Sequence, residues 1–487
     1  MLSTILIIPF LTAIASFLLK NKRNIEVSNV IAQGIVTLLS FVLLTQVEHG
    51  GAIFSPGKML MADALSAYLV GIVSLVAFIA ILYSVGYIGE EFKSGIIGMR
   101  RVRQYYALTQ LFICTMLLAL LSNNLAVMWV AIEGTTLATA FLISFYNNEK
   151  TIEAAWKYLI ICTVGITLAL FGTILVYYAS LRTGANVSDV LLWSSLVLGI
   201  SSHLDPELIK IAFIFIFVGY GTKVGLAPFH TWLPDAHGRA PTPISALMSG
   251  VLLNVALYSI LRFKVITDDA LGNQHFTNTL FVIFGFISIF IASFIILVAR
   301  KYKRLFAYSS IEHMGIITLG IGFGHPLSVL GALWHVFNHA MTKSMLFFTA
   351  GNILLKYHTG AIARVSGMIR IIPVTSLLFI FGLVAIVGLP PFSIFFSELL
   401  ILAGGFAGAY AWIAASVLLL FVVVFAGFFY HVNRMLFGDP PEGTKPGEVN
   451  RFMVAPIFFN LAVIVGLGIF LPGEFSTLLE QIRNILQ

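Results

Sequence analysis

The sequence predicts an all-α polytopic membrane protein with about 14 transmembrane helices, ten of them forming two inverted five-helix repeats that each contain a broken helix. The first observation behind this prediction is composition, because 59% of the 487 residues are hydrophobic and only 10% are charged, which is far outside the range of soluble proteins. The second is the recurrence of apolar runs long enough to cross a bilayer of about 30 Å. The third is a set of ionisable residues at matching spacings inside those runs.

The apolar runs divide the chain into four parts. Residues 1–103 hold three spans, 104–263 the first repeat, 264–435 the second repeat, and 436–487 a loop and the fourteenth span. The first run is expected to be retained, because no basic region precedes it, no small-residue cleavage site follows it, and a basic KNKRN segment comes next. In chain order the expected spans are 2–19, 27–47, 64–88, 105–121, 125–144, 158–178, 208–225, 244–263, 280–298, 307–322, 327–355, 372–402 with an interruption, 412–435 and 453–471.

The basic residues indicate how these spans cross the membrane. Of the 28 Lys and Arg residues, 20 fall in one set of alternate loops and 6 in the other, while Lys223 and Lys343 lie inside spans. We expect the chain to lie in the inner (cell) membrane. The positive-inside rule then places the loops with 20 basic residues in the cytoplasm. Because the number of spans is even, both termini are expected outside. Because the net charge of +7 comes from short loops and no basic domain is present, nucleic-acid binding is not expected.

Polar residues recur at a spacing that predicts the internal repeat. The members of three pairs are 175 to 179 residues apart and lie on spans of corresponding order. Because a unit of five helices is odd, the second copy enters the membrane from the opposite side, as in many transporters. The pairs are Glu133 with Glu312, Lys223 with Glu398, and Asn254 with His431. The spacing of Asn254 and His431 is equally compatible with chance.

Lys223 lies in an apolar span that is followed by helix-breaking residues. A charge at the centre of a membrane helix costs about 2.5 to 3.5 kcal/mol, so it is retained where it is paired or wetted. The segment GLPPFS (388–393) likewise interrupts the span before Glu398, and two breaks in matching positions indicate ion sites. A lysine that snorkels to the interface is the structural alternative. The residues expected to interrupt the first span are Gly219, Gly221, Gly225 and Pro228.

Two motifs carry a resemblance to a known family. They are PFHTWLPDAHGRAPTPISALMSG (228–250) and AYSSIEHMG (307–315). With them the chain resembles the antiporter-like proton-channel subunits shared by respiratory complex I, Mrp cation/proton antiporters and membrane-bound NiFe hydrogenases. The second motif is most similar to component F of hydrogenase-4.

The resemblance implies a function and partners. It implies a subunit that translocates protons or sodium ions in a redox-driven complex, together with other membrane subunits and with redox subunits that carry NiFe or iron–sulfur centres. Two alternatives stay open: a subunit of a multi-subunit cation/proton antiporter, and the membrane part of an inorganic-carbon uptake system or a structural scaffold.

The resemblance also implies roles for buried residues. Glu133 has no local basic partner, and in the family the glutamate at this place pairs with the lysine of the broken helix, here Lys223. Glu398 stands where relatives have a lysine or a glutamate at the end of a relay, which implies the terminal proton site. Asn254 stands where some relatives have a lysine, and because an amide does not titrate, transfer there is expected to use water, His230 or a neighbour.

The span 327–355 carries a polar stripe. His335, His339 and Lys343 recur at four-residue spacing and so share one face, which predicts a proton relay. Histidines satisfied by helix contacts are the alternative. The HxxxH spacing also suits zinc, but the sequence shows neither a third ligand nor an HExxH motif, so no metal is expected.

The remaining candidates are less defined by the sequence. Glu312 and His313 stand near the expected cytoplasmic start of the span 307–322, where an access channel and, nearly as well, a solvated end pair fit the pattern. His431 is the counterpart of Asn254. The two cysteines, in separate apolar runs without a CxxC motif, exclude iron–sulfur, haem and disulfide chemistry in this chain, so no cofactor is expected.

Overall fold

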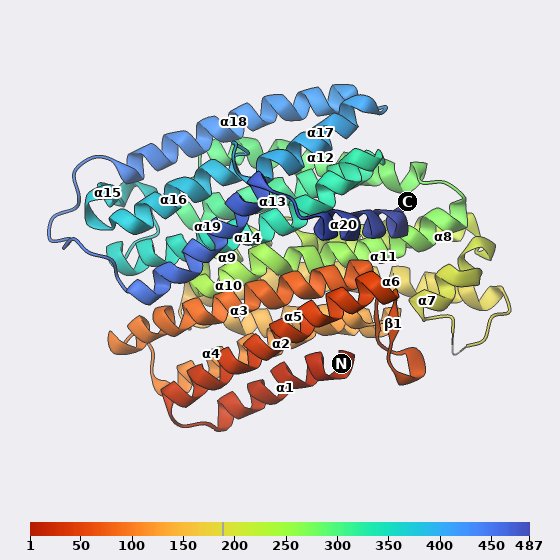
Figure 1. The fold of residues 1–487 in the computed structure, drawn as a ribbon, viewed down its shortest axis with the longest axis horizontal. Coiled ribbons are helices and arrows are strands. Elements are labelled where there is room, and N and C mark those ends of the chain that lie inside the picture. The colour runs from red at the N-terminus through yellow and green to blue at the C-terminus, as the bar shows by residue number, and fades with distance from the viewer. Residues whose placement is uncertain (188) are drawn as a thin grey trace.

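The computed structural model describes residues 1–187 and 189–487, and nearly all of their regular structure is helical (Figure 1). The predicted polytopic helical fold is confirmed. The first half contains α1 (Leu2–Leu18), α2 (Lys22–Gly50), β1 (Ile53–Phe54), β2 (Met61–Ala62), α3 (Ala64–Lys93), α4 (Met99–Leu121), α5 (Leu125–Ile143), α6 (Glu149–Arg182), α7 (Trp193–Ser195), α8 (Pro206–Val224), α9 (Trp232–Arg239), α10 (Thr242–Leu247) and α11 (Leu253–Leu271). The second half contains α12 (His275–Leu297), α13 (Tyr302–Gly322), α14 (Pro326–Tyr357), α15 (Met368–Ile371), α16 (Pro373–Ile386), α17 (Ser393–Ala407), α18 (Ala411–Leu436), α19 (Val454–Ile469) and α20 (Gly473–Leu486).

Each expected span overlaps one helix or two consecutive helices. Within the described residues, nine helical segments are long and apolar enough to cross a membrane on their own, one of them being α10 and α11 joined through a π-helical turn (Met248–Leu252). The other expected spans differ from these in recognisable ways. The helix α1 is short, α8, α13 and α14 carry ionisable side chains, and α16 with α17 form one divided span.

Loops of the same predicted side lie at the same end of the bundle. A β-bridge joins Leu60 to Ser122 at the predicted outer end, and another joins Lys301 to Ala361 at the predicted cytoplasmic end. In Figure 1 both termini lie toward the right-hand end of the bundle with β1 and α7, whereas α15 lies at the left-hand end. This arrangement agrees with an even number of membrane crossings.

The four helices α7, α9, α15 and α20 lie outside the predicted spans, and α20 is the longest of them. The last helix, α20, is amphipathic and buries one face against α3, α11 and α14. Its end is fixed by the Gln487 side chain, which donates a hydrogen bond of 3.0 Å to the Gly324 carbonyl oxygen. Because α20 has only 14 residues, a search for membrane-spanning apolar runs does not detect it. The buried face consists of Leu478, Leu479, Ile482 and Leu486.

The first predicted helix break is confirmed at Gly225 and Pro228. The helix α8 ends at Val224, Gly225 adopts a left-handed conformation with φ of 81°, and the chain becomes helical again in α9. The prediction was wrong for Gly219 and Gly221, because α8 is continuous through both.

Gly219 instead serves close packing between helices. A methyl group at Gly219 would lie 2.6 Å from the Gly165 carbonyl oxygen of α6, which is too close, so the glycine lets α6 and α8 approach. A second glycine contact has the same form: a methyl group at Gly285 of α12 would lie 2.9 Å from the Gly315 carbonyl oxygen of α13.

The second predicted break is also confirmed. The helix α16 ends at Ile386, Gly388 adopts a left-handed φ of 69°, and α17 begins at Ser393. A Cβ atom at Gly388 would lie 2.0 Å from Oε2 of Glu398, so the glycine leaves room for that carboxylate at the break.

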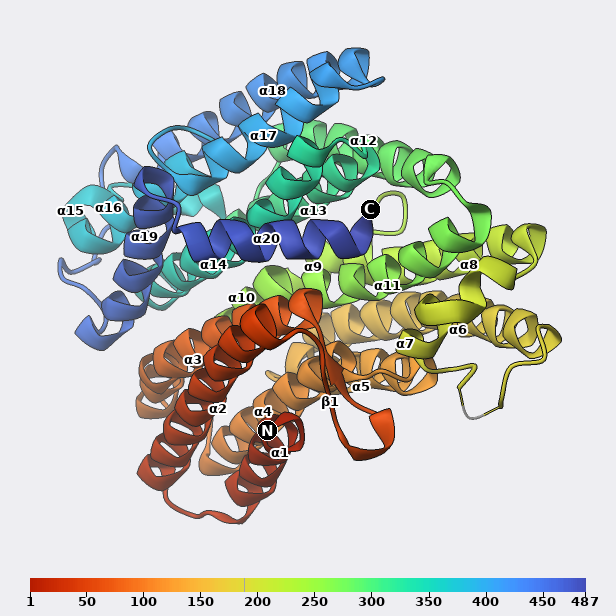
Figure 2. The same cartoon turned by 45° about the vertical axis from the view of Figure 1, so that its right-hand side comes forward.

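The long helix α14 connects the two halves of the bundle. It contacts α3 and α10 on one side and α13, α16 and α17 on the other. Figure 2 shows it between the N-terminal helices α1 to α5 and the group formed by α12, α17 and α18. Each broken span packs against the preceding long helix of its half: α8 packs against α6, and α17 packs against α14. The repeat boundaries themselves stay a prediction.

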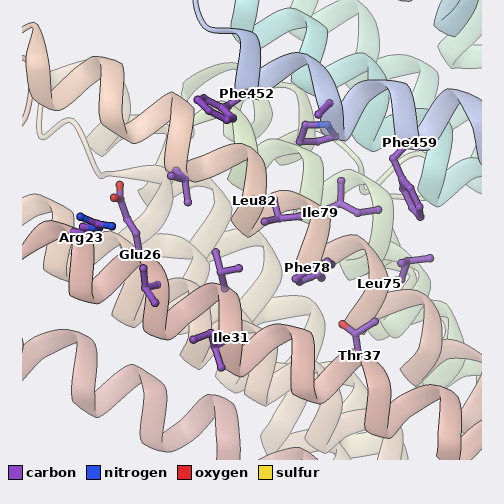
Figure 3. A pocket seen from close by; sticks show the side chains of 15 residues that line it. Arg23, Glu26, Ile31, Thr37, Leu75, Phe78, Ile79, Leu82, Phe452 and Phe459 are labelled. Carbon is purple, nitrogen blue, oxygen red and sulfur yellow. The ribbon is translucent and has the colours of Figure 1, made fainter.

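A surface groove of about 750 Å³ lies between α2, α3 and the first part of α19 (Figure 3). Arg23 and Glu26 lie at one end of this groove, and most of its remaining lining is apolar, including Phe78 and Phe459. None of the ionisable residues singled out from the sequence lines it. The candidate site therefore lies inside the helix bundle.

Candidate ion-translocation site

Lys223 is completely buried and is held by three groups from neighbouring helices. Its Nζ donates hydrogen bonds to Thr136 Oγ1 of α5 at 2.9 Å and to the Tyr158 hydroxyl of α6 at 2.5 Å. The Tyr158 ring lies 4.6 Å from Nζ, at cation–π distance. Because the ammonium points into the bundle, the snorkelling alternative is wrong.

Glu133 lies one helical turn before Thr136 on α5 and does not touch Lys223. Its Oε1 accepts a hydrogen bond of 3.1 Å from Thr163 Oγ1, and its buried Oε2 has no protein partner among the described residues. The family resemblance pairs Lys223 with Glu133. In the structure, the Lys223 ammonium instead binds the hydroxyl of Thr136, three residues further along α5. In the structure the two side chains thus have separate hydrogen-bond partners.

Lys343 of α14 shows the same pattern in the second half. Its Nζ, completely buried, donates to Ser309 Oγ at 2.6 Å and to the Phe306 carbonyl oxygen at 3.2 Å, both on α13. Glu312 lies three residues after Ser309, is 2% exposed, and has a buried Oε2 without a protein partner among the described residues. Two buried lysines thus bind hydroxyls one turn from a glutamate, which is half-buried at Glu133 and buried at Glu312.

The buried position of Glu312 corrects the sequence analysis. The helix α13 begins at Tyr302, five residues before the expected start, so Glu312 lies in the middle of the helix and not at a solvated end. Polar residues at the start of α13 hid this extension, because a search for apolar runs begins at the first apolar residue.

Three side chains from three helices meet near the second helix break. Nδ1 of His313 on α13 lies 2.9 Å from Nε2 of His335 on α14 and 4.0 Å from Oε1 of Glu398 on α17. All three residues are buried. The outer nitrogens of both rings are also bonded, Nε2 of His313 to the Ile386 carbonyl oxygen at 3.1 Å and Nδ1 of His335 to Ser397 Oγ at 3.0 Å.

The hydrogen-bond network assigns the protons of this cluster. A carbonyl oxygen only accepts, so Nε2 of His313 carries a hydrogen. The Ser397 hydroxyl donates to the Ile394 carbonyl oxygen at 2.8 Å, so Nδ1 of His335 carries a hydrogen and donates to Ser397. When both rings are neutral, their inner nitrogens, Nδ1 of His313 and Nε2 of His335, carry no hydrogen, and their lone pairs face each other. A contact of 2.9 Å between them is favourable when a proton or another cation lies there.

The other predicted residues lie outside these three clusters. His339 stacks on His313 with ring centroids 5.7 Å apart, while both of its ring nitrogens have no protein partner among the described residues. Asn254 donates to the Gly250 carbonyl oxygen of its own helix segment at 2.8 Å. Nε2 of His431 contacts the last carbonyl oxygens of α12 at 3.1 Å, so His431 stabilises the end of that helix.

Further buried polar atoms have no protein partner among the described residues. They include Nδ1 of His230, both ring nitrogens of His237 and Oδ1 of Asn254. An unpartnered buried polar group costs about 1 to 3 kcal/mol, so such positions are those at which proteins bind internal water. Water-mediated transfer past Asn254 therefore fits the structure.

Sequence reasoning missed several residues of the site. Thr136, Tyr158, Ser309 and Ser397 supply hydroxyls to the lysines and to His335. Isolated hydroxyl residues are common in membrane helices and give no periodic signal. His237, buried and stacked on a phenylalanine ring, lies within the motif 228–250 and could have been singled out there.

The fold and these clusters of ionisable groups inside the bundle define a multi-pass membrane protein of the antiporter-like type. Residues 122–426 match the family described as "NADH:quinone oxidoreductase/Mrp antiporter, TM", and the chain belongs to that family. It is 39% identical to a hydrogenase-4 component F homolog of Methylacidiphilum infernorum (isolate V4) over 419 residues, which cover 86% of each chain. The predicted resemblance is confirmed.

Solved structures show the same fold at lower identity. A chain of the membrane-bound sulfane sulfur reductase, an archaeal respiratory membrane complex, matches with a TM-score of 0.86 at 23% identity, covering 100% of this chain and 97% of that one. A chain of the Mrp complex from Dietzia sp. DQ12-45-1b matches with a TM-score of 0.84 at 18% identity, covering 100% and 98%. These relatives belong to multi-subunit membrane complexes, which supports membrane-subunit partners for this chain.

Proposed function

We propose that this chain is a proton-translocating membrane subunit of a redox-driven complex. The observation that carries the proposal is the contact of His313 with His335 beside Glu398 at the second helix break. Imidazole nitrogens exchange protons near neutral pH, whereas hard cations such as sodium prefer oxygen ligands. The chemistry of this cluster therefore favours protons over sodium ions.

The lysines act as switches in this proposal. A nearby carboxylate holds the proton on a lysine, and its withdrawal lets the proton leave. The separated pairs of Lys223 with Glu133 and of Lys343 with Glu312 supply one position of each switch, in which a hydroxyl replaces the carboxylate. Rotation of the lysine or glutamate side chain toward the other member supplies the second position.

The proposed route connects the two halves through α14. A proton leaving Lys223 passes the polar groups of His230, His237 and Asn254 with internal water, and reaches Lys343. From Lys343 it continues along the face of α14 that carries His339 and His335. The route ends at Glu398, where the broken helix leaves space for the carboxylate.

The proposed setting is a complex in the inner membrane with both termini outside. Partners that carry NiFe or iron–sulfur centres are favoured by the relative at 39% identity, whose name is that of a hydrogenase component. The likeness to a chain of an Mrp complex favours a second candidate, a subunit of a cation/proton antiporter. Identification of the subunits that purify with this chain separates the two: redox proteins support the first, and small antiporter subunits support the second.

Substitution of Glu398 tests the proposed function. Glu398→Gln keeps the shape and hydrogen bonding but cannot release a proton, so the complex should assemble and fail to pump protons into vesicles. Glu398→Asp shortens the reach and should pump slowly. Glu474→Gln, at an exposed position of α20, is the matched control and should pump normally. Full-rate pumping by Glu398→Gln would show that Glu398 is not the terminal site.

A further inference from the structure

The cluster at the second helix break has the composition of a metal site. One ligand atom from each of His313, His335 and Glu398 lies within 4.8 Å of the other two, and the three residues come from α13, α14 and α17. Two imidazoles and one carboxylate form a ligand set that zinc uses in proteins. The sequence analysis expected no metal because HxxxH showed no third ligand, whereas the structure brings ligands from two other helices to His335.

The outer contacts of the two rings direct both inner nitrogens toward one point. Metal-binding histidines usually donate their second N–H to a carbonyl or another acceptor, which fixes the ring and its tautomer. Nε2 of His313 does this with the Ile386 carbonyl oxygen, and Nδ1 of His335 does it with Ser397. The same contacts that leave two lone pairs facing each other also preorganise them for a cation.

The spacing of the ligand atoms requires little rearrangement. Zinc–nitrogen bonds of about 2.0 to 2.1 Å in tetrahedral geometry place two nitrogens about 3.4 Å apart. The inner nitrogens of His313 and His335 are 2.9 Å apart, so a separation of about half an ångström suffices. Oε1 of Glu398 at 4.0 Å can approach by rotation about its side-chain bonds.

The helix break gives the Glu398 carboxylate room beside the two imidazoles. A Cβ atom at Gly388 would lie 2.0 Å from Oε2 of Glu398, so the glycine keeps this position free for the carboxylate.

We propose that His313, His335 and Glu398 bind a zinc-type divalent cation in place of the transferred proton, and that this ion blocks the exit of the relay. The cation is held by Nδ1 of His313, Nε2 of His335 and Oε1 of Glu398. The blocking effect rests on the proposed function, whereas binding of the cation does not.

Binding is tested on the full chain in lipid nanodiscs with Co²⁺ and Zn²⁺ alone. Co²⁺ should bind in one equivalent per chain with the visible absorption of a low-coordinate site, and Zn²⁺ should displace it. X-ray absorption of the zinc-loaded wild type should show two imidazole ligands and oxygen. Absence of one-to-one binding, or a spectrum without imidazole, would overturn the proposal without any variant.

Three variants then locate the site. His335→Gln and Glu398→Gln should each weaken Zn²⁺ binding by at least about 100-fold, since even outer contacts of metal ligands change affinity by 10- to 100-fold. His339→Gln, one turn away on α14 and outside the ligand set, should keep wild-type affinity. Equal losses in all three variants, or none in the first two, would contradict the assignment, and equal elution and melting of the purified variants controls for folding.

The transport assay separates this inference from the proposed function. Wild-type vesicles should pump protons, and Zn²⁺ at saturating occupancy should stop them. Pumping by a chain that binds no Zn²⁺ would leave the proposed function intact and refute the metal site. One-to-one Zn²⁺ binding by a complex that never pumps protons would support the metal site and refute the proposed function.

Discussion

Thr136→Val removes the hydroxyl that holds the Lys223 ammonium while keeping the shape of the side chain. The lost hydrogen bond measures 2.9 Å and involves a charged donor in a completely buried place. Hydrogen bonds to charged groups contribute about 1.5 to 3 kcal/mol, so the separated form of the Lys223 and Glu133 pair should become about 10- to 150-fold less populated. The Tyr158 hydroxyl remains as a second acceptor, so the single variant should lie near the lower end of this range.

The assay is proton pumping by the complex in inverted vesicles, with electron transfer measured in parallel. Thr136→Val should pump several-fold more slowly than wild type, and the double variant Thr136→Val/Tyr158→Phe should be slower again. Thr136→Ser retains the hydroxyl and is the matched control. Wild-type pumping in Thr136→Val, or an equal loss in Thr136→Ser, would refute the role assigned to this hydroxyl.

Three further predictions concern ionisable residues inside the bundle. Lys223→Ala and Glu133→Ala should each abolish pumping with little effect on assembly, and their double variant should be far from additive; near-normal pumping in either single variant would contradict the pairing. Lys343→Met should block transfer between the halves, and Lys343→Arg should also block it because arginine stays protonated, so normal pumping by the arginine variant would reduce Lys343 to an electrostatic role. Asp63→Asn should destabilise the protein by about 3 to 5 kcal/mol, measured by unfolding in detergent, because it leaves Arg262 buried without the carboxylate that now binds both of its terminal nitrogens at 2.6 Å; an unchanged unfolding midpoint would contradict this estimate.

The helix breaks and the buried lysines could be predicted from the sequence for local reasons. Gly225 and Pro228 cannot continue a helix whatever surrounds them, and a lysine in an apolar run is conspicuous by itself. The failure at Gly219 has a related cause, because the sequence does not show whether a glycine bends a helix or serves close packing against another.

The contacts that define the site could not be predicted in this way. The approach of His313, His335 and Glu398 depends on how three helices pack, which the spacing of residues along one helix does not show. The hydroxyls of Thr136 and Ser309 lie on different helices from the lysines that they bind, so their role depends on helix packing. Packing therefore decides which polar residues of a membrane bundle act together.

The two glycine contacts restrict the sliding of helices that carry the proposed lysine–glutamate switches. The contacts of Gly165 with Gly219 and of Gly285 with Gly315 bring backbones together with no side chain that could yield, so α6 with α8, and α12 with α13, each form one stiff unit. Sliding of such units belongs to microseconds or longer, whereas side-chain rotations take picoseconds to nanoseconds when they are free. In the proposed mechanism, lysine and glutamate side chains on these stiff helices therefore rotate faster than the helices slide, so the overall rate is set by the slower electrostatic change that drives them.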